Sequence, residues 1–175
     1  KDPEYVGRAK EIQKAQKAVE ADTCPASVVP EVKAVMDTIK TKFSDVSRKN
    51  VGFGSTIFAV KPGDGSAREQ AASCQKVLGG WANIANEYAT KRYRSNLINW
   101  GMLPFIIDEG ELPFKNLDYL FLPNIRTAVE EGKSEFEAYV VKDGELKPFT
   151  LKMGALTPDE KEIILKGCLI NYYRG

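Results

Sequence analysis

The first third of the chain places apolar residues at helical spacing. Between positions 3 and 21 they recur every three or four residues among Lys, Glu and Gln: Tyr5, Val6, Ala9, Ile12 and Val19. After Pro25 a second helical pattern opens at Pro30, with Val32, Val35, Met36, Ile39 and Phe43 along one side. The spacing predicts an exposed amphipathic helix followed by a second helix, within a helical segment that covers residues 1–45.

The pattern changes after Asn50, where apolar runs alternate with helix-like stretches. VGFGSTIFAV (51–60), WANIANEYA (81–89) and MLPFII (102–107) are rich in β-branched and aromatic residues. Between them, 67–78 and 91–100 have helical character and end at glycines. This alternation predicts an α/β fold with a mixed or parallel sheet in a body that covers residues 50–175.

The remainder of the chain indicates further strands and one last helix. Residues 117–122, 135–141 and 146–151 have strand character, and Asp143-Gly144 is a hairpin signal that favours antiparallel pairing. The sequence TPDE at 157–160 combines a capping threonine, a proline at the first helical position and a glutamate that can reach back. We therefore expect a helix over 158–169 and a single domain over 1–175. Because the chain begins at Lys1 rather than at methionine, we expect it to be either processed or a piece of a longer chain.

Charge and composition narrow the functional classes. The 25 Lys and Arg residues nearly balance 24 Asp and Glu residues, so the chain carries no general field that would attract nucleic acid or an anionic membrane. Apolar runs are far shorter than the roughly 20 residues of a membrane span. A soluble cytoplasmic protein that captures a small ligand through a local feature is the expectation.

Cysteine and histidine usage limits the available chemistry. Cys24, Cys74 and Cys168 are far apart and form no C-x-x-C pair, so they are expected to be buried, reduced thiols that bind no metal. The chain has no histidine, which removes every Ser-His triad and the commonest general base. Any catalysis must use other groups.

The stretch KPGDGSAREQAAS (61–73) is the strongest candidate for a site, and it permits two interpretations. In the first, Ser66 and Glu69 form a capping box and the loop only starts a helix. In the second, a glycine-rich turn between strand and helix directs backbone N–H groups into a crevice, and Arg68 adds a bidentate fork for a carboxylate. The loop does not match phosphate-binding G-x-G-x-x-G or G-K-[ST] patterns, so nucleotide binding is not expected.

The Ser66 hydroxyl by itself is a very weak acid and does not form the alkoxide that could act as a base at neutral pH. A helix amino terminus stabilises a nearby negative charge by about 0.3–1 kcal/mol and at most ~2 kcal/mol. One pKa unit corresponds to about 1.36 kcal/mol, so the helix lowers a serine pKa by little more than one unit. Proton abstraction by Ser66 therefore needs further cations and exclusion of water.

Two sequence blocks then resemble a known family. GDGSAREQAA and the later VLGGWANIANEYATKRYRSNLINWGMLPF resemble the swivelling carboxy-terminal domain of the aconitase family, in its loop G-x-G-S-S-R-E-H-A and its later R-x-N-L…G-L-L-P-like segment. The resemblance covers about 63–107, more loosely continues through 118–122, and is nearest to bacterial aconitase-like hydratases. It implies a swivelling β/β/α domain of a hydro-lyase, and it implies that this chain is the carboxy-terminal part of a longer chain.

The resemblance also implies roles for individual residues. Ser66 corresponds to the catalytic base beside a substrate carboxylate, Arg68 to the substrate-binding clamp, and Gly65 and Ala67 to backbone N–H donors. The family's [4Fe-4S] cluster is held by other domains, so the implied partners are cluster-bearing domains of the same chain or a large subunit, together with a small carboxylic acid. The implied reaction is reversible dehydration or isomerisation of a small hydroxy di- or tricarboxylic acid.

Several positions depart from the family pattern or support other functions. Ala67 replaces a second serine, Gln70 replaces a histidine, and no upstream position matches the family's other substrate arginine. A non-catalytic small-acid sensor is one alternative. RNA binding through Lys91, Arg92 and Arg94 around Tyr93 is another, although a solvated helix face is the simpler interpretation. Trp81 and Trp100 are expected to be buried against the sheet rather than to line a ligand pocket.

Overall fold

The computed structural model describes residues 3–175, so the first two residues of the expected helical segment lie outside the described range. Three helices form that segment: α1 (Tyr5–Glu20), the short 3-10 helix η1 (Pro25–Ser27) and α2 (Glu31–Lys40). The two predicted helices are confirmed. α2 ends before Phe43, whose ring instead packs edge-on against Phe121 with ring centroids 5.2 Å apart.

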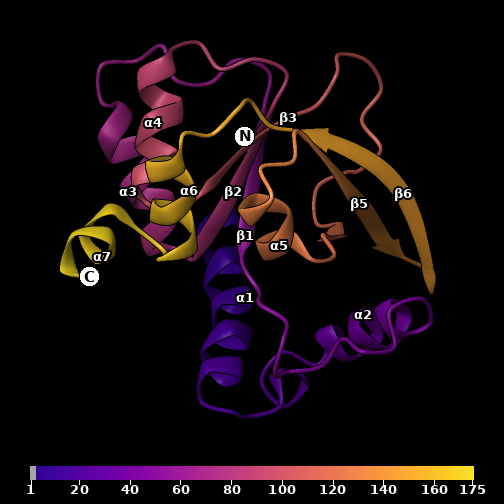
Figure 1. Ribbon diagram of the computed structural model, residues 1–175. Coiled ribbons are helices and arrows are strands. Elements are labelled where there is room, and N and C mark those ends of the chain that lie inside the picture. The colour runs from indigo at the N-terminus through magenta and orange to yellow at the C-terminus, as the bar shows by residue number, and fades with distance from the viewer. Residues whose placement is uncertain (1–2) are drawn as a thin grey trace.

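A six-stranded mixed sheet forms the body (Figure 1). Its strands are β1 (Ser55–Ala59), β2 (Gly80–Ala85), β3 (Leu103–Ile106), β4 (Tyr119–Phe121), β5 (Glu135–Lys142) and β6 (Glu145–Lys152). Their order in the sheet is β1-β2-β3-β6-β5-β4. β1, β2 and β3 are parallel, whereas the pairs β3–β6, β6–β5 and β5–β4 are antiparallel. The predicted α/β fold with a mixed sheet is confirmed.

The hairpin between β5 and β6 shows why its turn residues matter. Asp143 and Gly144 both adopt positive φ angles, 52° and 74°. A two-residue turn of this geometry matches the right-handed twist of the flanking strands. The hairpin predicted from Asp143-Gly144 is therefore confirmed, and the two strands pair along their full length.

Four helices pack on the sheet in two groups. α3 (Arg68–Val77) and α4 (Lys91–Asn99) enclose a cluster of Ala72, Tyr93, Leu97 and Met102. α5 (Ile125–Glu130) and α6 (Pro158–Leu165) pack with the main core. That core is built by alternate strand residues, among them Ile84, Phe105, Phe136 and Leu151.

Three details differ from the sequence-based expectations. α5 was not predicted, because its single short turn carries too little periodicity. The last helix is interrupted near Gly167, which has φ +90°, so it ends at Leu165 and a separate α7 (Leu169–Arg174) follows. Cys24 and Cys74 are exposed and Cys168 is half-buried, which corrects the expectation that all three thiols are buried.

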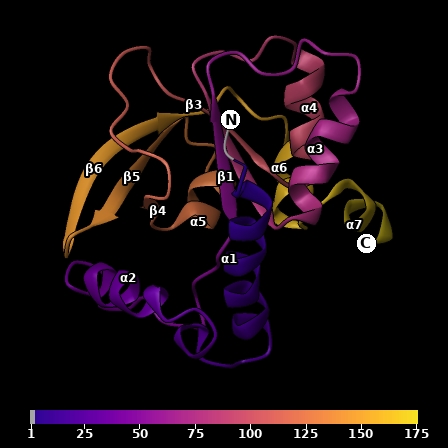
Figure 2. The ribbon, with the colours of Figure 1, turned by 180° about the vertical axis from the view of Figure 1, so that it is seen from behind.

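The helical segment has a small core of its own. Ala15, Val29, Val32, Met36 and Phe53 are buried together, separately from the main core. Figures 1 and 2 agree that α1 runs from beside β1 away from the body and that α2 lies beyond the turn end of the β5–β6 hairpin. The segment therefore meets the amino ends of the parallel strands, and the loops that follow these strands lie at the opposite edge.

Candidate active site at the carboxyl edge of the parallel strands

Two loops meet beyond the carboxyl ends of β1 and β2. The loop after β1 contains residues 60–67, and the loop after β2 contains residues 86–90. The Glu87 N–H donates to the Val60 carbonyl at 3.1 Å, and the Ala89 N–H donates to the Pro62 carbonyl at 2.9 Å. These bonds extend the pairing of the strands beyond the sheet, so the two loops form one hydrogen-bonded unit.

The carbonyl oxygen of Gly63 is the central acceptor of this unit. It accepts from Arg68 Nε at 3.0 Å and from the Thr90 hydroxyl at 3.1 Å. Gly63 has φ +98°, and a Cβ at this position would overlap the Tyr93 side chain. The turn therefore requires glycine, both for its backbone angle and for the close approach of the buried tyrosine ring.

This arrangement leaves the end of the Arg68 side chain available. Arg68 is half-buried, and within residues 3–175 it forms no ion pair. Only its Nε is engaged, so its two terminal nitrogens keep the planar fork that binds a carboxylate. The structure thus fixes the position of the Arg68 side chain through its Nε, and its two terminal nitrogens remain available to bind a ligand.

The predicted capping box is wrong. α3 begins at Arg68, its N-cap residue is Ala67, and no side chain caps it from that position. Ser66 therefore lies one residue too early to cap the helix. Glu69 occupies the second helical position rather than the third and cannot reach back as a capping box requires.

Asn96 of α4 and Trp100, which directly follows α4, hold the first turn of α3 in place of a cap. In the amide orientation that satisfies both of its side-chain atoms, Asn96 accepts from the Glu69 N–H at 3.1 Å and donates to the Arg92 carbonyl at 3.1 Å. Trp100 Nε1 donates to the Glu69 carboxylate at 2.6 Å. The first turn of α3 is thus held from the side, and the structure gives the N–H groups of Arg68 and Gln70 no acceptor among its described residues.

Ser66 lies on the open side of this helix start. Gly65, Ser66 and Ala67 are all exposed, and the Ser66 hydroxyl forms no hydrogen bond with the described residues. Within residues 3–175 no acidic or basic side chain is bonded to it. The surroundings of Ser66 in this arrangement therefore offer no group that would activate its hydroxyl.

Buried hydrogen bonds of Tyr93 and Tyr88 connect the elements that adjoin the two loops. The Tyr93 hydroxyl, in a residue only 3% exposed, accepts from Asn83 Nδ2 at 2.9 Å and from Gln75 Nε2 at 3.1 Å. Beside it, the Tyr88 hydroxyl lies 2.9 Å from the Phe105 carbonyl oxygen. Burial raises the pKa of Tyr88, so this phenol stays protonated and serves as a fixed donor.

The basic cluster on α4 and the two tryptophans differ in how far they are buried. Tyr93 is buried and Arg94 pairs with Glu160 at 3.1 Å, so only Lys91 and Arg92 of the basic cluster remain on the exposed surface of α4. Trp100 is half-buried at the end of α4. Trp81 is 40% exposed and lines a cavity, which corrects the expectation that it is buried against the sheet.

Within residues 3–175 no group of three or more Cys, Asp or Glu side chains could hold a metal ion. No helix there combines the length and apolar character needed to cross a membrane.

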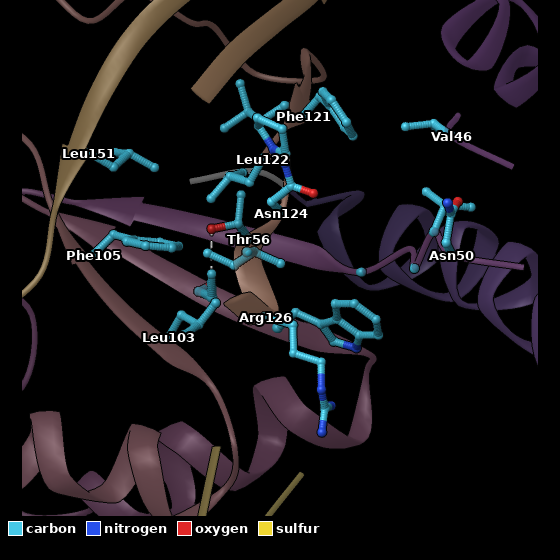
Figure 3. A pocket seen from close by; sticks show the side chains of 18 of the residues that line it. Val46, Asn50, Thr56, Leu103, Phe105, Phe121, Leu122, Asn124, Arg126 and Leu151 are labelled. Carbon is cyan, nitrogen blue, oxygen red and sulfur yellow. Dashed lines mark hydrogen bonds between the residues drawn. The ribbon is translucent and has the colours of Figure 1, made fainter. Parts of the chain in front are cut away.

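One cavity of the domain lies away from the loop. The cavity in Figure 3 has a volume of about 390 Å³ and is lined by the amino-terminal parts of β1, β2 and β3, at Thr56, Ala82 and Leu103. Ser66 and Arg68 do not line it. The candidate active site lies instead at an exposed edge of the domain, where Gly65, Ser66 and Ala67 are open to solvent.

The fold is a mixed-sheet domain in which a glycine-containing loop joins the first parallel strand to the uncapped start of α3. The aconitase C-terminal domain family matches residues 11–110. Because this match covers more than half of the described chain, the chain belongs to the aconitase C-terminal domain family. The match begins within α1 and so extends upstream of the sequence blocks at 63–107.

A solved structure supports the same relationship. The crystal structure of 3-isopropylmalate dehydratase from Methanocaldococcus jannaschii is 27% identical in sequence, with a TM-score of 0.50. The alignment covers 81% of this chain and 77% of that chain. A comparison with curated protein sequences gave no match.

Sequence reasoning missed the supporting residues of the site. Thr90, Asn96 and Trp100 each contact the loop or the first turn of α3. Thr90 had a local signal, since threonine before a helical run is a typical N-cap, and its hydroxyl does accept from the Tyr93 N–H. The bonds from Asn96 and Trp100 had no such signal, because they depend on how two helices pack.

Proposed function

We propose that this chain is the swivel domain of an aconitase-like hydro-lyase that reversibly dehydrates, or isomerises, a small hydroxy di- or tricarboxylic acid. Ser66 is the catalytic base, Arg68 binds a substrate carboxylate, and Gly65 and Ala67 present backbone N–H groups. Membership in the aconitase C-terminal domain family supports this reaction class. The similarity to a 3-isopropylmalate dehydratase supports a hydroxy dicarboxylic acid as the kind of substrate.

One observation carries the proposal: the Gly63 carbonyl fixes the stem of Arg68 and leaves its terminal nitrogens free. A guanidinium held in this way loses little conformational entropy when it binds a carboxylate bidentately. The N–H groups at the uncapped start of α3 add partial positive charge beside it. Together they form a seat for an anionic group next to the Ser66 hydroxyl.

In the proposed reaction the Ser66 alkoxide accepts the proton from the carbon beside a bound carboxylate, and the C–O bond of the adjacent carbon breaks as hydroxide departs. The proton held by Ser66 and the hydroxide leave together as water, which restores the base. Arg68 holds that carboxylate while negative charge develops on it. Since Ser66 is exposed here, we infer that a covering body supplies the water exclusion and the further positive charge that the base needs. The partner is a set of cluster-bearing domains of the same chain or a large subunit.

The [4Fe-4S] cluster of the family does not fit the residues of this chain. The structure brings no three potential ligands together within its described residues, and Cys24, Cys74 and Cys168 are free thiols at widely separated positions in the sequence. We therefore propose that the cluster is held elsewhere in the complete enzyme. The role of this chain is to bind, orient and deprotonate the substrate.

The test is turnover by the complete enzyme with the Ser66→Ala variant. We expect kcat to fall at least about 100-fold with little change in KM, since a positioned general base contributes about 10²–10⁴-fold. Arg68→Lys keeps the charge but loses the fork, so it should raise KM. Ser95→Ala, an exposed serine on α4, is the matched control and should leave both constants unchanged.

The same experiment separates the alternatives. Unchanged turnover in Ser66→Ala would exclude the assignment of the base. A wild-type enzyme that binds hydroxy acids without converting them would instead support the small-acid sensor. RNA binding is the less favoured alternative, because Arg94 is committed to Glu160 and Tyr93 is buried, which leaves no aromatic-and-basic face on α4.

A further inference from the structure

Two cavities at the amino ends of the parallel strands share one wall. The first, about 390 Å³, is lined largely by apolar residues such as Phe105, Leu122 and Leu151 (Figure 3). The second, about 480 Å³, lies between α1 and the body. The residues that line both are Trp81, Leu103, Ile125 and Arg126. We call the first the apolar chamber and the second the basic chamber.

The basic chamber carries an excess of positive charge. Its titratable lining residues are Lys17, Lys76, Arg126 and Glu20. Arg126 pairs with Glu130 at 3.5 Å and donates to the Leu165 carbonyl at 3.3 Å, and Glu20 accepts from Gln16 at 3.0 Å. Lys17 and Lys76 form no ion pair within residues 3–175.

Lys76 is the less hydrated of these two cations. It lies half-buried in the last turn of α3, and burial lowers the pKa of its amine despite the opposing effect of Cys168. A cation that is partly withdrawn from water and unpaired gains more from an anionic partner than an exposed one does. The chamber therefore favours an anion near Lys76.

The four shared lining residues form the junction between the chambers. A single ligand that occupies both chambers must pass along them, which restricts the shape of that anion. Figure 3 shows the Arg126 side chain extending away from the labelled apolar residues of the first chamber. A ligand at this junction would place its charged end in the basic chamber and its body along Leu103 and Ile125. Chambers of this size are within the usual range of ligand sites, roughly 300–1,000 Å³.

We propose that these chambers form a second binding site, separate from the Ser66 edge, for an amphipathic monocarboxylate. The carboxylate lies between Lys17 and Lys76, and the apolar body occupies the apolar chamber. The site lies at the amino ends of the parallel strands, whereas Ser66 follows the carboxyl end of β1. A strand of this length separates the two by about 13 Å, at ~3.3 Å per residue.

The test is calorimetric titration of the full chain with decanoate, with acetate and with decanol. Acetate supplies only the head and decanol only the body, so we expect decanoate to bind at least about 10-fold more tightly than either. Lys76→Met retains the length of the side chain and removes its charge. It should weaken decanoate binding about 10-fold or more, which is about 1.4 kcal/mol.

The matched control is Lys10→Met, which removes an exposed charge from α1 outside both chambers. Binding of decanoate should be unchanged in this variant. The proposal is overturned if wild-type protein fails to bind decanoate, if decanol binds equally well, or if Lys76→Met and Lys10→Met behave alike. Thermal unfolding of both variants shows that they are folded before the titrations are compared.

Discussion

The side chains of Glu69 and Trp100 join the two sequence blocks that characterise this domain. Trp100 Nε1 donates to the Glu69 carboxylate at 2.6 Å, across two helices that are separated by a strand in sequence. The Asn96 side chain completes the contact at the Glu69 N–H. The start of α3, where the candidate base and clamp lie, is thus positioned by the end of α4 rather than by its own cap.

A double-mutant cycle should detect this bond in the folding free energy. We expect Glu69→Ala and Trp100→Phe to be coupled by about 1 kcal/mol, the usual net value of a hydrogen bond. Urea unfolding of the two single variants and the double variant measures the coupling. The exposed ion pair Lys33–Asp37 on α2 is the comparison, and its coupling should be only about 0.3–0.5 kcal/mol. Equal coupling in the two pairs would contradict the positioning role of Trp100.

The stability of Ser66→Ala distinguishes an active-site serine from a helix cap. Because Ser66 caps nothing here, its replacement should change the free energy of unfolding by less than about 0.5 kcal/mol. Thr157→Ala is the positive control, since Thr157 and Glu160 form a complete capping box at α6. That variant should lose about 1 kcal/mol. A comparable loss in Ser66→Ala, measured by urea unfolding, would restore the capping interpretation.

Lys76 should make the stability of the protein depend on pH above neutrality. Burial lowers the pKa of its amine in the folded state, so the unfolded chain holds this proton to higher pH than the folded chain. Stability contributed by this group therefore rises with pH between the lowered pKa and the ordinary value of about 10.4. At neutral pH the partly buried charge on this amine lowers the free energy of unfolding, and Lys76→Met removes that cost.

The expected result is a higher Tm for Lys76→Met than for wild type at neutral pH, with a gap that narrows as the pH approaches about 10. In a chain of this size each kcal/mol of stability shifts Tm by about 2–4 °C. Thermal unfolding across this pH range measures the gap, and Lys10→Met reports the effect of removing an exposed charge from α1. A gap that widened with pH would contradict the assignment of the penalty to Lys76.

Much of the fold followed from local patterns. The runs at 51–60, 81–89 and 102–107 became β1, β2 and β3, and Asp143-Gly144 formed the predicted turn. These features depend on neighbours in sequence: apolar alternation, β-branched residues and turn residues with positive φ. The short α5 and the break near Gly167 were missed because each depends on packing against other elements.

Only part of the candidate site could be predicted from such local patterns. Ser66 and Arg68 could be selected from the sequence, since a glycine-rich turn before a helix is an anion-binding pattern. The capping box at Ser66 and Glu69 had an equally good local pattern and was wrong. The competing contacts from Asn96 and Trp100 decided the outcome, and they come from residues about 30 positions away.

The sequence by itself determined the class of fold, the hairpin and the loop that carries the candidate chemistry, because these depend on the preferences of adjacent residues. Only the tertiary structure decided that α3 starts at Arg68, that the Gly63 carbonyl serves both Arg68 and Thr90, and that Lys76 lines a chamber beneath α1. Such arrangements are fixed by hydrogen bonds and burial between distant segments. These contacts form only when the chain folds, so no pattern among adjacent residues predicts them.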